Sequence, residues 1–524
     1  MAGHAITPTV PAWGTVKDTF ESVNPATGEV LATFGVDGER EVAAALRQAR
    51  GAAAWWAGLS WQDRRLRLLA WKSHITRYMG RLAQLVHEET GKPLDDATLE
   101  IVNTILHLDW AAKHAQSVLK PRRVPSGLAM LNQAASVEYH PLGVVGVIGP
   151  WNYPVFTPMG SIGYALAAGN AVVFKPSELT TGTGQWLVQS FAGVLSEVFG
   201  ETEPVLQLIT GLGATGAELA KSGVDKIAFT GSAVTARKVL AAAAEKLTPV
   251  LAECGGKDAL LVAADADLDA AADAVAWGAM SNAGQTCIGV ERVYVCEPVY
   301  QAFLEKLNEK IAQLRPGDDD GAAYGPMTLP GQVDVVERHL ADAVARGGRA
   351  VAGGLDSVRA PYVDPVVLVD VPEESAAVRE ETFGPVVTVT PVPSLADGIR
   401  LANASPYALG SAVFTRRRRA GMRAARALRA GMTSVNSVIA FAAVPALPFG
   451  GSGESGFGRI HGADGLREFS RAKSITAQRM RPLVRTTTFR RNERDMDRIV
   501  QLVTVLHGRL YQPKRRRRLA DGRR

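Results

Sequence analysis

The stretch Val144-Val145-Gly146-Val147-Ile148-Gly149 decides the fold. It is a continuous apolar run, which is typical of a strand that is buried on both faces. It ends in the turn Pro150-Trp151-Asn152-Tyr153-Pro154, and a helical stretch follows over 158–168. The next apolar run, 170–174, is again followed by a helical stretch, over 182–198. This alternation predicts a parallel sheet with helices on both faces.

The same alternation continues along the chain. Further strands are predicted at 205–209, 226–229 and 249–252, with helices over 214–221 and 233–246. Right-handed crossovers make this an open, doubly wound α/β domain, whose ligands bind beyond the carboxyl ends of the strands. After Cys287 a second α/β region is predicted, with strands at 291–295, 362–369, 385–390, 411–414 and 432–436.

The first 140 residues have a different pattern. Residues 40–120 show helical periodicity, and they include Trp55, Trp56, Trp61 and Trp71. At helical spacing, tryptophans are more often packing residues than ligand contacts. Residues 127–142 are predicted to form a β-hairpin arm.

Length and composition exclude several classes of protein. The chain has 524 residues, 47% apolar and 21% charged, which suits a soluble globular protein of about three domains. No apolar run reaches about 18 residues, and the N-terminus lacks a secretory signal pattern. Three cysteines without a CxxC pair give neither a disulfide framework nor a metal site. We therefore expect a cytoplasmic protein without a bound metal.

The net charge of +6 is concentrated at the C-terminus. Residues 481–524 hold 14 Lys and Arg against 4 Asp and Glu, a balance of +10 that leaves −4 for the rest. A nucleic-acid-binding fold is therefore not expected. Residues 496–510 place Ile499, Val503 and Leu506 on one helical face, ahead of the basic run 514–518. Such a tail could touch an anionic membrane, pack on its own oligomer or stay solvated.

Three residues at predicted strand ends have catalytic chemistry. Cys287 sits in a turn of small and polar residues, where a thiolate nucleophile could form, although a lone cysteine is more often a buried apolar residue. Glu253 ends the strand at 249–252 and could be a general base, or a partner of Lys257. Asn152 could donate to an oxyanion, or be an ordinary turn residue.

Other strand ends suit a dinucleotide. Lys175 and Glu178 could bind a ribose, where an acid favours NAD over NADP, or they could form a solvated ion pair. The run from Gly211 to Gly216 matches GxGxxG between a strand and a helix. Ser232 lies in a small-residue turn at a predicted helix N-terminus, where a pyrophosphate can bind.

Taken together, these segments resemble the NAD(P)-dependent aldehyde dehydrogenase superfamily. The resemblance runs from Val23 to about Ile475. Seven motifs occur in the family's order: Pro150-Trp151-Asn152-Tyr153-Pro154, Lys175-Pro176-Ser177-Glu178, Phe229-Thr230-Gly231-Ser232, Glu253-Cys254-Gly255-Gly256-Lys257, Gly284-Gln285-Thr286-Cys287, Glu381-Thr382-Phe383-Gly384-Pro385 and Pro448-Phe449-Gly450-Gly451.

The resemblance implies a role for each site residue. Cys287 would attack the aldehyde, Asn152 would hold the oxyanion, and Glu253 would activate the water that hydrolyses the thioester. The implied cofactor-binding residues are Lys175, Glu178, Trp151, Gly211, Ser232, Glu381 and Phe383. The glycines of GxGxxG carry less weight, because this family binds its cofactor differently from ordinary Rossmann enzymes.

The resemblance also divides the chain. It implies two doubly wound parallel-sheet domains and a small hairpin arm through which the chain forms a homodimer or homotetramer. The predicted parts are a cofactor-binding domain (1–126 and 143–253), a catalytic domain (254–447), an oligomerisation arm (127–142 and 465–484) and a basic tail (485–524).

The substrate is predicted from the pocket mouth. The segment 438–447 is uncharged, and Trp151, Tyr153 and Phe156 add aromatic surface. An apolar or aromatic aldehyde is therefore favoured, since a carboxylate-bearing one would need an arginine clamp. Succinate semialdehyde is the alternative, because the segments 287–292 and 458–462 resemble some bacterial dehydrogenases for it. NADP in place of NAD, transfer to coenzyme A, and a catalytically silent binding protein on the same fold stay open.

Overall fold

The computed structural model describes residues 18–127, 130–482, 488–490 and 493–508. Within these ranges the chain forms two compact units. The larger unit comprises residues 18–120 and 139–472, and the smaller comprises 121–138 and the described residues from 473 onward. Each unit is described by itself.

The first sheet of the larger unit has the strand order β21-β9-β8-β5-β6-β7. Its parallel strands are β5 (Val144–Ile148), β6 (Ala171–Lys175), β7 (Leu206–Leu208), β8 (Lys226–Gly231) and β9 (Val250–Cys254), and β21 (Gly456–Phe457) pairs antiparallel to β9. The predicted doubly wound sheet is confirmed. The register aligns Ile148 with Lys175 and with Phe229, so the strands end at one edge.

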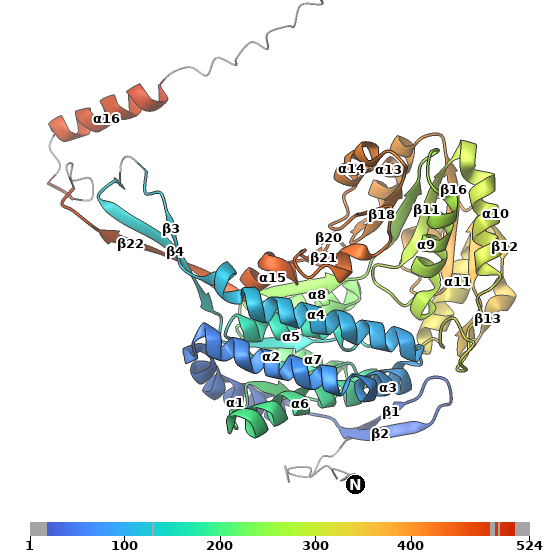
Figure 1. Ribbon diagram of the computed structural model, residues 1–524, viewed down its shortest axis with the longest axis horizontal. Coiled ribbons are helices and arrows are strands. Elements are labelled where there is room, and N and C mark those ends of the chain that lie inside the picture. The colour runs from blue at the N-terminus through green and yellow to red at the C-terminus, as the bar shows by residue number, and fades with distance from the viewer. Residues whose placement is uncertain (1–17, 128–129, 483–487, 491–492, 509–524) are drawn as a thin grey trace, which may run out of the picture. The chain divides into compact units, whose positions relative to one another are not determined.

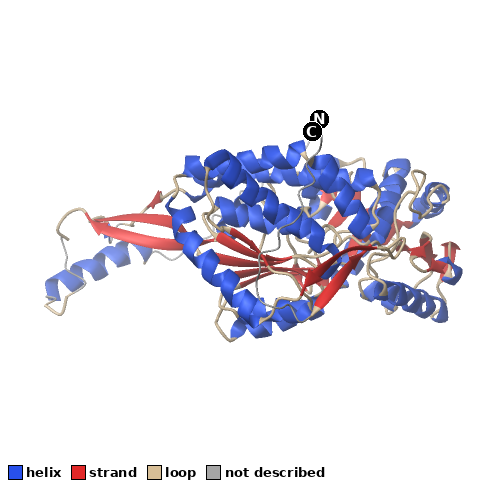
Figure 2. Ribbon diagram, turned by 90° about the horizontal axis from the view of Figure 1, so that it is seen from below, coloured by secondary structure: helices blue, strands red, loops and turns tan. Residues whose placement is uncertain are grey.

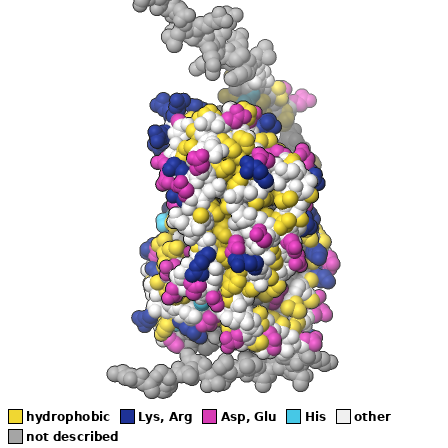
Figure 3. Space-filling model, turned by 90° about the vertical axis from the view of Figure 1, so that its right-hand side faces the viewer, with side chains coloured by type: hydrophobic (Ala, Val, Ile, Leu, Met, Phe, Trp, Pro, Cys, Tyr) yellow, Lys and Arg dark blue, Asp and Glu magenta, His cyan; other side chains and the backbone are white. Residues whose placement is uncertain are grey.

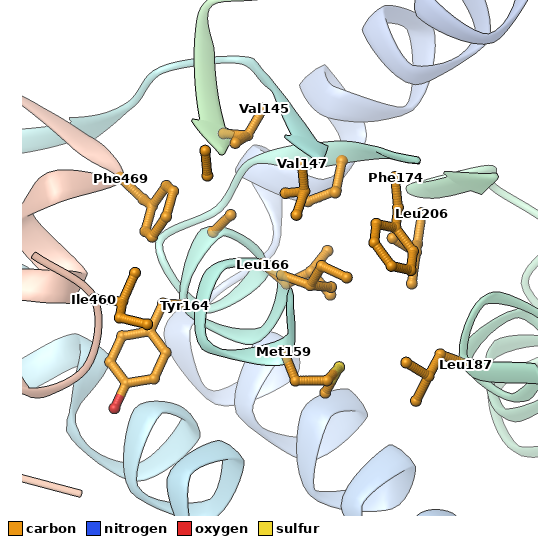
Figure 4. Close-up of a cluster of buried hydrophobic side chains, with 14 of the residues drawn as sticks. Val145, Val147, Met159, Tyr164, Leu166, Phe174, Leu187, Leu206, Ile460 and Phe469 are labelled. Carbon is orange, nitrogen blue, oxygen red and sulfur yellow. The ribbon is translucent and has the colours of Figure 1, made fainter. Parts of the chain in front are cut away.

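Helices cover both faces of this sheet (Figures 1 and 2). They include α5 (Phe156–Ala167), α6 (Thr181–Phe199), α7 (Gly213–Lys221) and α8 (Ala233–Ala244), each within a few residues of its prediction. Figure 4 shows why α5 is apolar all round: Met159 and Leu166 point among side chains of β5, β6 and α6. A helix buried on every side needs no polar face.

The helical N-terminal region packs against the same core. It consists of α1 (Glu39–Gly58), α2 (Trp61–Arg77), α3 (Met79–Thr90) and α4 (Leu94–Leu119). Trp56 and Trp71 are fully buried, and their indole N–H groups donate to the carbonyl of Leu166 and to Ser190 Oγ, each at 2.8 Å. The packing role predicted for these two tryptophans is confirmed. A hairpin of β1 (Thr19–Val23) and β2 (Val30–Gly35) precedes them and was not predicted.

The second sheet has the order β12-β15-β16-β11-β10-β18-β19. Its strands are β12 (Arg349–Ala352), β15 (Val366–Val369), β16 (Val386–Val392), β11 (Val290–Cys296), β10 (Asp258–Val262), β18 (Ser411–Phe414) and β19 (Ser434–Val435). Only β12 runs antiparallel to its neighbour within this sheet. The interior strand β10 was not predicted, because it follows β9 after a gap of three residues.

One predicted strand is wrong in extent. The run 362–369 is divided into β14 (Tyr362–Val363), which pairs with β13 (Val358–Arg359), and β15. Pro365 lies between them and has no N–H to donate to a ladder. Helices around this sheet are α9 (Leu268–Met280), α10 (Tyr300–Ile311), α11 (Gly331–Ala345), α12 (Ala376–Arg379), α13 (Leu395–Ala404) and α14 (Arg418–Ala427). Acidic and basic side chains are interspersed over the face in Figure 3.

A third sheet, ordered β22-β4-β3, contains β3 (Arg122–Val124), β4 (Gln133–Pro141) and β22 (Ser470–Gln478). The hairpin predicted over 127–142 therefore begins earlier. Its first strand is β3, in which Arg122 pairs with Val137 of β4 and Val124 pairs with Ala135. The first residues of the predicted arm segment 465–484 instead belong to α15 (Gly462–Glu468). The tail contains α16 (Glu493–His507), as its periodicity predicted, whereas the basic run 514–518 lies outside the described residues. None of the described helices is long and apolar enough to span a bilayer.

Candidate active site

Cys287 lies in a tightly folded loop between the 3-10 helix η3 (Ser281–Gly284) and β11. Asn282, Ala283 and Gly284 all have left-handed backbone angles, with φ of 53°, 54° and 70°. A β-carbon on Gly284 would lie 2.1 Å from the carbonyl oxygen of Gly384, so only glycine fits this approach. The loop is thereby held against the segment that contains Glu381 and Phe383. Left-handed non-glycine residues are costly and tend to occur where a site requires them.

The thiol of Cys287 is half-buried and lines a cavity. Burial raises its pKa far above the usual value, and the nearby carboxylates of Glu381, Glu253 and Asp258 raise it further. The backbone N–H of Ile288 opposes this effect by lowering the pKa. The free protein therefore holds Cys287 as a neutral thiol, and forming the thiolate requires a base.

Asn152 lies at the end of β5 with its amide directed at the cysteine loop. Its Nδ2 donates to the carbonyl of Gln285 at 2.9 Å, which leaves the second amide hydrogen for another acceptor. The backbone carbonyl of Asn152 accepts from Asn282 Nδ2 at 3.2 Å and from Lys92 Nζ at 2.7 Å. The amide donor and the thiol loop are thus fixed to one another.

Two buried charges that the sequence reading missed hold the Asn152 turn. Lys92 and Glu100 form an ion pair at 2.8 Å with side chains no more than 1% exposed. Glu100 also accepts the N–H groups of Val155 and Phe156, at 2.8 and 3.0 Å. The pair therefore binds backbone on both sides of Tyr153, whose ring lies 4.2 Å from Lys92 Nζ. No motif marks these residues, because they act through tertiary contacts.

Glu253 is 3% exposed, and neither of its carboxylate oxygens has a hydrogen-bond partner within the described part of the chain. Burial raises its pKa well above the usual value; Arg459 lowers it and Glu468 raises it. Lys257 pairs with Glu291, so the pairing with Lys257 weighed for Glu253 is wrong. An unpartnered buried carboxyl is costly, and it suits a proton-transfer role.

Glu381, Phe383 and Trp151 gather on another side of the thiol loop. Glu381 accepts the N–H of Gly256 at 2.9 Å, and burial with the charge of Glu291 raises its pKa to about 8. The rings of Phe383 and Trp151 meet edge to face, with centroids 5.7 Å apart. Trp151 therefore does not line the aldehyde cavity as predicted, because its ring packs against Phe383 instead.

The predicted ribose and phosphate residues lie at the ends of β6, β7 and β8. Lys175 Nζ donates to the carbonyl of Pro176 at 3.0 Å and lies 3.9 Å from Glu178, whose side chain is 45% exposed. Ser232 begins α8, where its Oγ accepts the N–H of Thr235 at 3.2 Å. Gly211 has a φ of 145°, and a β-carbon there would lie 2.1 Å from Thr215 Oγ1.

This donor set fits a dinucleotide. An accessible carboxylate beside a lysine can bind ribose hydroxyls, and a helix N-terminus can bind a phosphate. Of the three GxGxxG glycines, only Gly211 is required by a close approach, since a β-carbon at Gly216 would lie at an ordinary contact distance of 3.5 Å from Lys175 and one at Gly213 would meet no atom within 4 Å.

The cavity beside Cys287 has a volume of about 130 Å³. Its walls are mostly apolar, with Leu99, Phe156, Trp277, Ile288, Ile439 and Phe449 among them. Tyr153 and Phe156 line it as predicted, and so does the predicted mouth segment through Ile439 and Ala442. Asp96 also lines it, and within the described chain this carboxylate forms no ion pair.

Two buried histidines stand behind this wall. The rings of His107, on α4, and His461 are 3.9 Å apart, and both contact the ring of Phe156 at 5.2 Å. His107 Nε2 donates to the carbonyl of Ala442 at 2.9 Å, and burial lowers the His107 pKa to about 4. The imidazole is thus neutral, and it ties α4 to the 3-10 helix η6 (Ala440–Ala443).

The family follows from a match that covers most of the chain. The model of the aldehyde dehydrogenase family matches residues 13–475. The chain belongs to this family. A 4,4'-diapolycopene aldehyde oxidase of Methylomonas sp is 38% identical over 465 residues, covering 88% of this chain and 86% of the relative. The predicted family and fold class are therefore confirmed.

Two further relatives differ in the cofactor that their names give. A Mycolicibacterium smegmatis protein, provisionally named an NADP(+) succinate-semialdehyde dehydrogenase, is 34% identical over 459 residues, 87% of this chain and 88% of its own. The crystal structure of PnpE from Pseudomonas, in complex with nicotinamide adenine dinucleotide, has a TM-score of 0.83 and 31% identity, covering 90% of this chain and 96% of PnpE.

Proposed function

We propose that this aldehyde dehydrogenase family member oxidises an apolar or aromatic aldehyde to the carboxylic acid, with NAD preferred to NADP. The observation that carries the proposal is the cavity itself: Cys287 opens into it, the Asn152 amide is fixed beside the cysteine loop, and Glu253 is buried without a partner. A nucleophile, an oxyanion donor and a base on separate segments of the chain suit acyl chemistry.

In the proposed reaction, the Cys287 thiol gives its proton to solvent water, its sulfur adds to the aldehyde carbon, and the carbonyl oxygen becomes an oxyanion. That oxygen accepts from Asn152 Nδ2 and from the backbone N–H of Cys287. When bound, NAD(P) supplies the acceptor for the hydride that leaves this carbon, and a thioester on Cys287 results. Glu253 then takes a proton from water, whose oxygen attacks the thioester. The acid departs, and the proton passes from Glu253 to the Cys287 sulfur, which restores the thiol.

The cofactor preference rests on Glu178. Its exposed carboxylate lies beside Lys175, where it would bind the ribose 2′-hydroxyl and repel a 2′-phosphate. Lys175 is the residue that favours NADP, but its ammonium is buried and already donates to Pro176. The Mycolicibacterium smegmatis relative is named for NADP(+), whereas the PnpE structure is named for nicotinamide adenine dinucleotide.

The apolar cavity supports the substrate class. Asp96 adds a negative charge to the wall, so a carboxylate-bearing aldehyde such as succinate semialdehyde would be repelled. Succinate semialdehyde therefore stays the second candidate, on the strength of the named relative. A silent binding protein is disfavoured by the complete set of Cys287, Asn152 and Glu253, and transfer to coenzyme A by Glu253.

The assembly is proposed to be a homodimer or homotetramer. The three-stranded sheet of β3, β4 and β22 offers β3 and β22 as edge strands that can pair with another copy. The edge strands of a short sheet have unpaired backbone N–H and C=O groups that a second copy can pair with. This supports an oligomer but does not distinguish a dimer from a tetramer.

The test is NADH or NADPH formation at 340 nm across a panel of aldehydes, without coenzyme A. We expect turnover with apolar aldehydes, faster with NAD, and none with Cys287→Ala. Glu253→Gln should release about one equivalent of NADH and then stall, because the thioester forms but is not hydrolysed. Folded wild-type protein that turns over no aldehyde with either cofactor would refute the proposal.

A further inference from the structure

Helix α16 presents apolar side chains that are left exposed within the described part of the chain. None of its described side chains is buried, and the exposed ones include Met496, Val500, Leu502, Val503, Val505 and Leu506, each between 39% and 69% exposed. At 3.6 residues per turn these positions span more than half of the circumference toward the C-terminal end. An isolated 15-residue helix with such a surface is stabilised mainly by packing its apolar face on something else.

The charge around α16 is unusual for this chain. Residues 481–524 carry a balance of +10, whereas the rest of the chain carries −4. Within α16 the acids lie in the first turns, at Glu493, Asp495 and Asp497, and the second half has none. The basic run 514–518 follows the apolar half in the sequence. In the sequence, the positive charge therefore comes after the apolar half of α16, in residues that lie outside the described ranges.

We propose that α16 docks on an anionic lipid bilayer. Its apolar half would lie at the level of the acyl boundary, and the basic residues that follow would attract the lipid phosphates. Helices that lie in a bilayer interface combine these two features, and the two contributions add. The charge complementarity is specific to this segment, because the remaining chain is acidic and would be weakly repelled.

A second copy of the chain fits this surface less well. Two-helix pairing uses a narrow seam with the first and fourth residues of a heptad apolar, flanked by charges. In α16 the apolar arc is wider, and Val500 and Val505 lie on its opposite borders. Pairing with one other helix would leave one of these borders in water, and it would not use the +10 charge.

Docking would bring the enzyme to its substrate, a step that rests on the proposed function. Apolar aldehydes partition into bilayers, so an enzyme at the membrane surface meets them at a higher local concentration. The membrane contact itself does not depend on the reaction, and it can be measured without any aldehyde.

The test is co-sedimentation of the full-length protein with vesicles of phosphatidylcholine alone or with about one third phosphatidylglycerol. We expect binding to the anionic vesicles, weakened by 0.5 M salt. Val503→Asp should lower the partition coefficient by about tenfold, because it places a charge in the apolar arc. Gln501→Asp is the matched control, since it adds the same charge to the same helix on the opposite face, and it should change binding by less than about threefold.

A second variant separates the charge from the helix. Replacing Lys514 and Arg515–Arg518 by Gln should weaken binding at least about tenfold. The proposal fails if the anionic vesicles do not retain wild type, or if Val503→Asp and Gln501→Asp bind alike. It also fails if Val503→Asp changes the oligomer size in light scattering and leaves vesicle binding intact, which would identify a second copy as the occupant. Turnover of a short, water-soluble aldehyde should be unchanged in every variant, so that a loss of docking is distinguishable from a loss of the proposed reaction.

Discussion

Asp96 brings a carboxylate to a cavity that is otherwise largely apolar. Burial raises its pKa, Lys92 lowers it and Asp95 raises it. The charge of Lys92 is also paired with Glu100, so it compensates Asp96 only in part. An anionic substrate in this cavity would therefore meet a negative charge.

Asp96→Asn should make the enzyme more tolerant of carboxylate-bearing aldehydes. A repulsion of about 1 kcal/mol is worth about fivefold in an equilibrium. We expect kcat/KM for succinate semialdehyde to rise about fivefold and kcat/KM for hexanal to stay within about twofold. Asp95→Asn is the control, because that neighbouring acid is exposed and does not line the cavity. Equal effects of the two variants would show that Asp96 does not act from the cavity wall.

Glu381 makes the stability of the free protein depend on pH. Its folded-state pKa is raised to about 8 from the ordinary value of 4.5. Between these values the folded state binds the proton and the unfolded state does not, so unfolding releases a proton and stability falls as pH rises. Glu381→Gln should flatten the decline in unfolding free energy from pH 5 to pH 8, measured by urea denaturation without cofactor. An unchanged slope would contradict the raised pKa.

At the scale of elements, a hydrogen bond connects α4 to η6, which contributes Ala442 to the cavity wall. His107 donates to Ala442, and η6 begins after Ile439, whose φ of 55° is left-handed. A β-branched residue in that conformation is strained and must be held by its surroundings. The neutral His107 ring is thus a positioning residue for the wall that Ile439 and Ala442 form.

His107→Leu should loosen this wall. The variant leaves the buried carbonyl of Ala442 without its donor, at a cost of about 1–3 kcal/mol. We expect KM for apolar aldehydes to rise about fivefold or more, with kcat within about twofold, because the catalytic residues are untouched. His107→Gln, which can still donate, should recover part of the loss. His114→Leu is the control on the same helix, where the histidine is exposed. A fall in kcat with KM unchanged would argue against a positioning role.

The elements that could be predicted from the sequence are those with local patterns. Continuous apolar runs predict β5 and β6, and helical periodicity predicts α5. These patterns are local because the buried residues of each element lie close together in the sequence. β10 could not be separated from β9 by pattern alone. Lys92, Glu100 and His107 could not be found either, because each gains its role from a partner between 8 and 335 residues away in the chain.

The strand-end residues were predictable for a topological reason. In a parallel sheet the carboxyl ends share one edge, so Asn152, Lys175 and Glu253 are placed along that edge once the strands are found. The aldehyde cavity was less predictable, since α4 contributes Asp96 and Leu99 to it. The catalytic and cofactor roles of these residues stay predictions until activity is measured.

At the scale of the whole molecule, the cores of the larger unit do not use the tail. The buried hydrophobic clusters of the described chain draw on residues between Val42 and Phe469. Helix α16 contributes no buried side chain, although it carries much exposed apolar surface. Folding of the catalytic region should therefore be independent of everything after β22.

A chain that ends at residue 482 should keep its stability and its catalysis. Because no core residue is removed, we expect its melting temperature to stay within about 2 °C of the full-length value. For a chain of this size, a change of 1 kcal/mol in the free energy of unfolding shifts the melting temperature by about 2–4 °C or less. Turnover of a soluble aldehyde should also be unchanged. The measurements are thermal unfolding and NADH formation, with light scattering to follow the oligomer. A drop of 5 °C or more together with a smaller oligomer would show that α16 packs within the assembly, and that its apolar arc is an interface between copies of the chain.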